Sequence, residues 1–173
     1  MNHTTEVIGY MVFEANNPVQ DDDDTQPVDS LVREAEDGVL SGGFDIGSDA
    51  AASGGKYVHV PGWSRRKSTP DENQKVEYTF NVSNAGYYRI KGWVYAPDGS
   101  RDSFFVKVNG KPAAGYEWHV LQNTTYAPDY VRDGVGGNPV EIWLDGKEPA
   151  TTVTVYQREA QTRLDKIKLE LVK

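Results

Sequence analysis

Cysteine is absent from this 173-residue chain, so disulfide bonds and thiol chemistry are excluded. Long apolar runs are also absent. The longest are a few residues, far below the roughly 20 that a membrane-spanning helix needs. No membrane partner is therefore expected. Aromatic residues, in contrast, make up 11% of the chain, which is typical of a folded protein and not of a disordered one.

An excess of basic residues is the third absence. The chain holds 26 acidic and 18 basic residues, and residues 1–30 contain seven of the acids and none of the bases. The remaining 19 acids and 18 bases leave residues 31–173 almost neutral. A general nucleic-acid binder carries a large basic excess, so no nucleic-acid partner is expected.

The chain divides once, near residue 30. Residues 7–13 form a short apolar stretch that resembles the last strand of a preceding module. Four consecutive aspartates at 21–24 repel one another and favour a solvated linker, and they lack the spacing and the glycine of an EF-hand loop. We therefore predict the end of an upstream module plus an acidic linker over 1–30, and one domain over 31–173. The first 20 residues show no signal peptide, so for a secreted protein it is expected upstream.

Residues 31–173 alternate between apolar and polar side chains in many short segments. Residues 75–82 alternate with period two, as do the segments around 104–108, 140–144, 153–155 and 167–171. Turn signals such as Asn109-Gly110 separate them, and no long helical repeat is present. This pattern predicts an all-β, antiparallel sandwich or barrel.

Three acidic residues fall in phase with apolar neighbours. Glu34 and Glu36 follow Val32 at intervals of two on the first predicted strand, and Asp165 precedes Ile167 in the same way on the last predicted strand. Buried carboxylates are costly unless they are paired or bound to a cation, and oxygen-only ligation suits calcium. Backbone carbonyls from Ser53 to Lys56 could complete such a site. The alternative is that the acids lie at strand ends, solvated or paired with Lys166 or Arg33, and spacing alone leaves both readings open.

An ordered set of motifs resembles the carbohydrate-binding modules of families 35 and 6. The set comprises residues 32–38 (VREAEDG), 54–58 (GGKYV), 76–80, 85–88 (AGYY) and 164–167 (LDKI), and it extends over the whole of 31–173. The resemblance implies a jelly-roll β-sandwich with a galactose-binding-like fold. It also implies a structural calcium held by Glu34, Glu36 and Asp165.

In these families the sugar site lies in loops at one end of the sandwich. An aromatic position of the families falls here at His59, and an asparagine position falls at Arg163, so the usual contacts do not carry over. An arginine there is a forked donor suited to carboxylate or sulfate. The loop at 61–67 places Trp63 beside three basic residues, which would suit an acidic polysaccharide. The simpler interpretation is a mobile, solvated loop that binds no ligand.

Other aromatic residues lie near expected turns. Trp118 and Tyr126 are candidates for stacking on sugar faces because polar and turn residues flank them. Tyr130 and Arg158 complete the candidate set, whereas Trp93 and Trp143 lie within strand patterns and are assigned to packing.

Together these features predict a non-catalytic carbohydrate-binding module that targets a secreted polysaccharide-degrading enzyme to its polymer. The expected ligand is an algal or plant-wall polysaccharide, first an acidic or sulfated galactan such as agar or carrageenan, then a neutral xylan or β-glucan. The expected state is a monomer beside an upstream catalytic module. No spacing links a pair of carboxylates as a glycosidase requires, so no enzyme activity is expected. The alternative is a structural sandwich module that packs against its neighbour and binds no sugar.

Overall fold

A computed structural model describes residues 31–172 as two antiparallel sheets, one of seven strands and one of five. The seven-stranded sheet contains β1 (Val32–Glu34), β3 (Asp45–Ser48), β4 (Lys56–His59), β6 (Gly86–Ala96), β9 (Asn123–Tyr130), β10 (Ile142–Leu144) and β12 (Arg163–Leu171). The five-stranded sheet contains β2 (Val39–Ser41), β5 (Lys75–Phe80), β7 (Ser103–Val108), β8 (Lys111–His119) and β11 (Thr151–Gln157). The predicted all-β jelly-roll sandwich is confirmed, while the predicted upstream strand and acidic linker lie outside the described residues.

The predicted alternation explains how the sheets pack together. On β5, Val76, Tyr78 and Phe80 are buried against the facing sheet, whereas the residues between them are more exposed. The predicted turn after β7 is present, because Asn109 and Gly110 both have positive φ angles, 48° and 76°. That left-handed geometry matches the twist of a two-residue hairpin, and it joins β7 to β8.

Two short 3₁₀ helices interrupt the strands. The first, η2 (Ala35–Asp37), takes the chain from β1 in one sheet to β2 in the other, and the second, η3 (Ser53–Gly55), precedes β4. Ala35 is fully buried and its carbonyl accepts a hydrogen bond of 3.0 Å from the Tyr78 hydroxyl of the facing sheet. The prediction that Glu34 and Glu36 lie on one continuous strand is therefore wrong, because β1 ends at Glu34.

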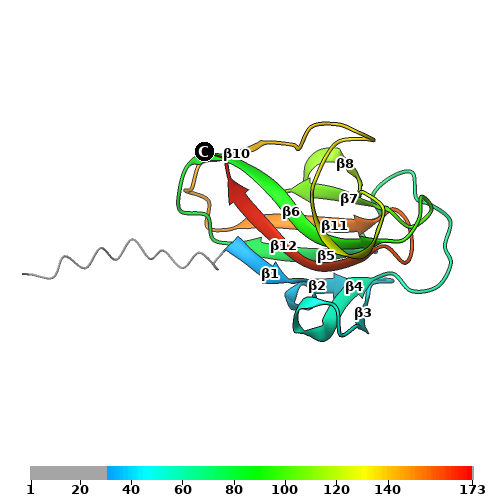
Figure 1. Cartoon of the computed structure of the whole chain (residues 1–173). Helices are drawn as coiled ribbons and strands as arrows, with labels where there is room; N and C mark the ends of the chain where they lie inside the picture. Colours follow the sequence, from blue (N-terminus) through cyan, green and yellow to red (C-terminus); the bar gives the residue numbers. More distant parts are fainter. Residues whose placement is uncertain (1–30, 173) are drawn as a thin grey trace, which may run out of the picture.

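Strand β12 lies at the centre of the seven-stranded sheet and positions the candidate sites. It pairs with β6 along one edge, and the two strands run side by side across the molecule in Figure 1. Its other edge is shared between β1 and β4. The register with β6 shifts between Leu164 and Lys166, so Asp165 is an extra residue in a bulge. A bulge redirects a side chain, and this one lies where β1 ends and β4 begins.

The outer face of the five-stranded sheet is covered by the segment between β4 and β5. All six residues of β7 are consequently buried. Lys67 donates its backbone N–H to the Arg158 carbonyl at 2.8 Å, and Glu72 accepts from Lys107 at 2.9 Å. Within the described part of the chain, no helix is long and apolar enough to cross a membrane.

Candidate functional site

The predicted acidic residues converge beside the bulge in β12. Asp165, only 3% exposed, accepts a hydrogen bond of 2.7 Å from the Ser53 backbone N–H. The Ser53 hydroxyl donates to Glu34 Oε1 at 3.0 Å. Burial raises the pKa of Asp165, and the nearby negative charges of Glu34 and Glu36 raise it further. Residues more than 100 positions apart in the sequence thus form one acidic cluster of Glu34, Glu36 and Asp165.

The acidic cluster contains carboxylate oxygens that lack a partner. Glu34 Oε2 and Glu36 Oε2 are buried and accept no hydrogen bond from any residue between 31 and 172. Gly54 adopts a positive φ of 62°, and a Cβ built on it would lie 3.4 Å from Glu36 Oε1. Across residues 31–172, no group of three His, Cys, Asp or Glu side chains stands ready-made for a metal ion. The unpartnered oxygens are nevertheless the kind of donor that calcium takes.

A second feature lies at the end of the sandwich where β4 and β6 finish and β12 begins. A cavity of about 280 Å³ opens there. Its lining includes His59 from β4, Tyr95 from β6, Arg163 from β12, and Gly62, Arg101 and Gln161 from loops. We refer to it as the loop-end pocket. The loops lie at the right of Figure 1, at the opposite end from the C-terminus.

Arg163 lines the pocket and packs against aromatic rings on neighbouring strands. Its guanidinium carbon lies 4.6 Å from the centroid of the Tyr57 ring and 4.5 Å from that of Tyr95. Asp49 accepts a hydrogen bond of 3.1 Å from Arg163 Nη1 and one of 3.3 Å from the Tyr126 hydroxyl. The Tyr126 ring also packs 5.8 Å from Tyr95. The arginine is therefore held between two aromatic rings. Tyr126 contacts both Tyr95 and Asp49, the two residues that hold Arg163 in place.

Gln161 ties together the loops that border the pocket. Its side-chain N–H₂ donates to the Gly62 carbonyl at 2.9 Å, and its side-chain oxygen accepts from Arg101 at 3.0 Å. Trp63, which follows Gly62 in the sequence, is 83% exposed, and its ring centroid lies 5.8 Å from the Arg101 guanidinium. The predicted Trp63 is thus an open aromatic surface at the pocket rim.

The charged side chains that line the pocket are basic, and each lining arginine is paired with a carboxylate outside the lining. The described lining residues include two guanidinium groups and one imidazole but no carboxylate. The carboxylates of Asp49 and Asp98 contact the two arginines from outside this lining. Burial lowers the pKa of His59, and the positive charge of Arg163 lowers it further, so the imidazole is neutral at pH 7.

The interpretation of Trp118 as a sugar platform is wrong. Its side chain lies on β8, is completely buried (0% exposed) and packs 5.8 Å from the Phe104 ring in the core. The polar residues that flank it in sequence belong to the opposite face of the strand, not to a loop. The segment around Tyr126 is also a strand, β9, although Tyr126 itself lies close to the pocket.

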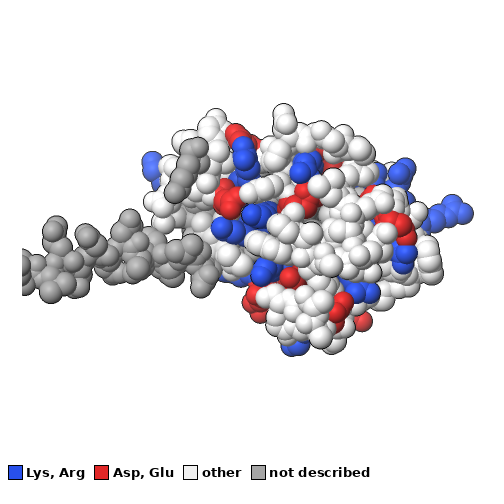
Figure 2. Space-filling model, viewed as in Figure 1, with Lys and Arg blue, Asp and Glu red and all other residues white. Residues whose placement is uncertain are grey.

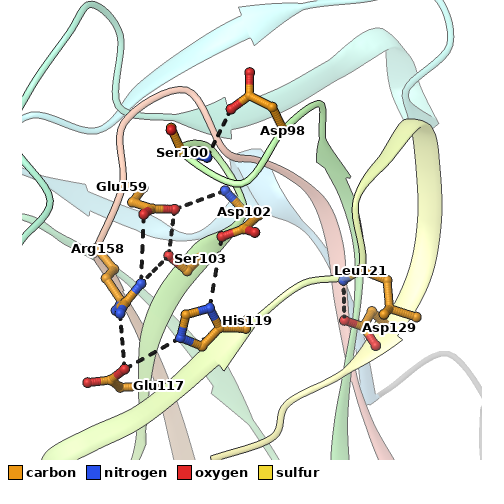
Figure 3. A network of polar contacts seen from close by, with 10 residues as sticks. All are labelled: Asp98, Ser100, Asp102, Ser103, Glu117, His119, Leu121, Asp129, Arg158 and Glu159. Carbon is orange, nitrogen blue, oxygen red and sulfur yellow. Dashed lines mark hydrogen bonds and ion pairs between the residues drawn. The ribbon is translucent and has the colours of Figure 1, made fainter. Parts of the chain in front are cut away.

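Arg158 and Tyr130 do not join the pocket either. Arg158 is 5% exposed and belongs to the polar network of Figure 3, where it donates to Ser103 at 2.7 Å and to Glu117 at 3.1 Å. Tyr130 pairs with Lys91, partway back along β6 from Tyr95, and its hydroxyl donates to Glu170. Of the seven predicted sugar-site residues, the structure brings together His59, Trp63, Tyr126 and Arg163.

Several residues that line the pocket or hold Arg163 in place have no clear signal in the sequence. Tyr57 and Tyr95 resemble ordinary strand aromatics in sequence, and Arg101 and Gln161 lie in loops with no motif. One signal was available for Tyr95, because it lies in the polar phase of a strand whose alternate residues are apolar. The packing assignment of Trp143 is also wrong, since this side chain on β10 is 56% exposed.

Comparison with known structures identifies the fold. A family 35 carbohydrate-binding module from Clostridium thermocellum matches with a TM-score of 0.58 and 23% identity, covering 80% of this chain and 96% of that one. A GH26-CBM35 β-(1,4)-mannanase from Podospora anserina has a TM-score of 0.58 at 16% identity, covering 83% and 28% of the two chains. An exo-β-1,3-galactanase from Phanerochaete chrysosporium, determined with β-1,3-galactotriose, gives 0.54 at 24% identity, covering 80% and 29%.

No family model and no curated protein matches the sequence. The structural matches show that the chain has the fold of family 35 carbohydrate-binding modules, and they confirm the resemblance to that family at the level of the fold. The chain spans nearly all of one isolated module but under a third of the two enzymes.

Proposed function

We propose that residues 31–173 form a non-catalytic carbohydrate-binding module whose ligand occupies the loop-end pocket. The observation that carries the proposal is the combination of aromatic and hydrogen-bonding groups at one end of this fold. Sugar rings are recognised by aromatic surfaces that pack on their C–H faces and by fixed polar groups that bind their hydroxyls. Trp63 and Tyr95 offer the aromatic surfaces, while Arg101, Gln161 and Arg163 offer the polar groups.

Rigidity supports this function. Arg163 is fixed by Asp49 and by two rings, and Gln161 is fixed by Gly62 and Arg101. Groups that are already ordered lose little conformational entropy when a ligand binds. A shallow pocket of this volume holds about one sugar unit, so we expect modest affinity for a single site.

An acidic or sulfated sugar is the ligand class that the charges favour. The described lining of the pocket contains two guanidinium groups and no carboxylate, and arginine pairs with carboxylate and sulfate in a forked geometry. From Arg163, the same face of β12 continues through Lys166 and Lys168, and Lys91 lies opposite Lys168 on β6. Figure 2 shows blue atoms gathered over these two strands, although acidic atoms lie among them. An acidic galactan such as agar or carrageenan is thus the first candidate, and neutral xylan or β-glucan the second.

Targeting is the role that follows from such a site. A module without catalytic residues raises the effective concentration of polymer for an enzyme in the same polypeptide. The mannanase and galactanase matches carry this fold within longer chains. We propose the same arrangement here, with a catalytic module before residue 1, secretion of the whole protein and a monomeric state.

We also propose that the acidic cluster holds a structural calcium ion. Glu34, Glu36 and Asp165 would supply carboxylate oxygens, and carbonyls of the turn from Ser53 to Lys56 would complete the ligands. The two buried carboxylate oxygens without partners support this assignment. The ion would offset the repulsion between the three carboxylates and would join β1, η3 and β12.

Thermal unfolding with and without calcium tests the metal. At free calcium 100 times the dissociation constant, binding adds about 2.7 kcal/mol to the free energy of unfolding. We expect calcium to raise the Tm relative to EDTA for the wild type and for the control Glu148→Gln, which removes an exposed carboxylate elsewhere. Asp165→Asn should abolish that rise. A calcium response retained in Asp165→Asn would disprove the assignment.

Affinity electrophoresis tests the sugar site. The probes are agarose, carrageenan, polygalacturonate, arabinoxylan and barley β-glucan, and the variants are Trp63→Ala and Arg101→Gln. Trp63 is 83% exposed, so Trp63→Ala should keep the wild-type Tm. Arg101→Gln also removes hydrogen bonds to Asp98 and Gln161 and should lower the Tm slightly. Both variants should lose most retardation on the polymer that the wild type binds. The control Leu121→Ala changes another exposed apolar residue and should bind normally. A folded wild type that no probe retards would favour the structural-module alternative.

A further inference from the structure

A second concave surface lies on the side of the sandwich, at the end away from the loop-end pocket. Two adjoining cavities, of about 260 and 460 Å³, share Asn109, Trp143, Leu144 and Glu148 in their linings. They lie between β10, at an edge of the seven-stranded sheet, and the β7–β8 turn of the five-stranded sheet. We refer to them together as the edge groove.

Trp143 is the main aromatic residue of the edge groove. It pairs with Tyr87 of β6, and the two rings meet edge-on with centroids 5.2 Å apart. The two side chains are 56% and 52% exposed. Packing in the core does not explain them, because both remain more than half exposed while their neighbours Tyr88 and Leu144 are buried. A pair of open aromatic rings beside a cavity needs another explanation.

Polar side chains line the cavities that Trp143 borders, and two of them are fixed in place. The Asn109 side-chain oxygen accepts a hydrogen bond of 2.8 Å from the Thr152 backbone, which anchors the amide in the wall shared by both cavities. Lys111 and Tyr116 line the larger cavity, and Asp145 lines the smaller one. Asp145 accepts from the Lys147 backbone at 2.9 Å, which orders the adjoining turn.

We propose that the edge groove is a second glycan-binding site, separate from the loop-end pocket. The inference rests on the proposed function, because it extends sugar recognition to another surface of the same module. A groove lined by an exposed indole, an amide, an ammonium, a hydroxyl and carboxylates offers stacking and hydrogen bonding together, as a sugar requires.

The distance between the two sites indicates how they would act. Tyr87 lies opposite Trp143 and Tyr95 lines the loop-end pocket, and both belong to β6. Eight residues of extended strand span roughly 26 Å at about 3.3 Å per residue. The two sites therefore engage different chains or distant units of one chain, and simultaneous binding increases avidity for the polymer.

Affinity electrophoresis on the five-polymer panel, with the full chain, tests this site. We compare the wild type with Trp143→Ala, Trp63→Ala and the double variant, and use Val135→Ala as a control that truncates another exposed apolar residue. Trp143→Ala should weaken retardation about tenfold or more, the loss expected when an aromatic anchor is truncated. Trp63→Ala should keep residual binding that the double variant loses.

The possible failures are distinguishable. If Trp143→Ala is retarded like the wild type and Trp63→Ala loses all binding, the second site is disproved and the proposed function stands. If no folded variant or wild type is retarded, both fail together. If Trp143→Ala changes only the sedimentation coefficient and not retardation, the groove is a protein contact and the glycan inference is wrong. A loss of Tm in Trp143→Ala is resolved by Trp143→Phe, which should restore retardation.

Discussion

Replacing Trp118 by alanine tests most sharply whether this residue belongs to the hydrophobic core or to the sugar site. The indole is fully buried between Phe104 and the β6 backbone, where Gly92 leaves room for it. A Cβ on Gly92 would lie 2.4 Å from the Trp118 ring, so the glycine is required at this contact. Truncating a buried tryptophan costs about 3–5 kcal/mol, a large part of the roughly 5–15 kcal/mol that stabilises a domain.

The expected shift can be worked out from the size of the domain. For a domain of about 150 residues, each 1 kcal/mol lowers the Tm by roughly 2–4 °C, so Trp118→Ala should melt roughly 6–20 °C below the wild type. Trp118→Phe should lose less. It keeps much of the ring and removes an indole N–H that is buried without a partner among residues 31–172, a defect that costs about 1–3 kcal/mol.

Circular dichroism during heating measures the shift, and affinity electrophoresis at a temperature where the variant is folded measures sugar binding. The structure predicts a large loss of stability with normal retardation of the folded protein. A Tm within 2 °C of the wild type together with weakened retardation would refute the reasoning, since Trp118 would then be a ligand contact.

Two further predictions concern pH. Burial raises the pKa of Asp102, and a hydrogen bond and the negative charge of Glu159 raise it further. The ionised form is therefore disfavoured in the folded state. As a consequence, the free energy of unfolding falls as pH rises through that pKa. Asp102→Asn should therefore increase the free energy of unfolding in urea at pH 7 and not at pH 3, and a decrease at pH 7 would contradict this. Burial and the positive charge of Arg163 lower the pKa of His59. As pH drops below about 6.5, His59 takes up a proton in the unfolded chain before it does so in the folded protein, and the free energy of unfolding therefore falls. His59→Gln should flatten that decline in the range from pH 7 to 5.5, and an unchanged slope would argue against it.

The fold could be predicted from the sequence because its strands carry a clear alternating pattern. Residues 75–80 and 167–170 bury every second side chain, as the pattern predicts, whereas Leu171 at the strand end is 38% exposed. The pattern fails at Trp118, because alternation identifies which residues share a face but not which face the other sheet covers. The same limit explains Trp143, which lies in a strand and still faces outward.

The two candidate sites differ in how visible they are in the sequence. The acidic cluster could be predicted because carboxylates interrupt apolar patterns, even though Glu36 lies in η2 and not on a strand. Its convergence depends on the bulge at Asp165 and on β1 and β4 sharing an edge of β12, which spacing does not encode. The loop-end pocket depends on Gln161 and Arg101 joining loops 60 residues apart. Such a contact leaves no local pattern.

The most direct test of the central claim is an NMR titration of the isotopically labelled protein. The ligand is an oligosaccharide prepared from whichever polymer of the panel retards the wild type. If the loop-end pocket binds sugar, the backbone amide resonances of Gly62, Arg101, Gln161 and Arg163 will shift together as the oligosaccharide is added. Saturable binding that leaves these four amides unmoved would contradict the assignment of the loop-end pocket as a sugar site.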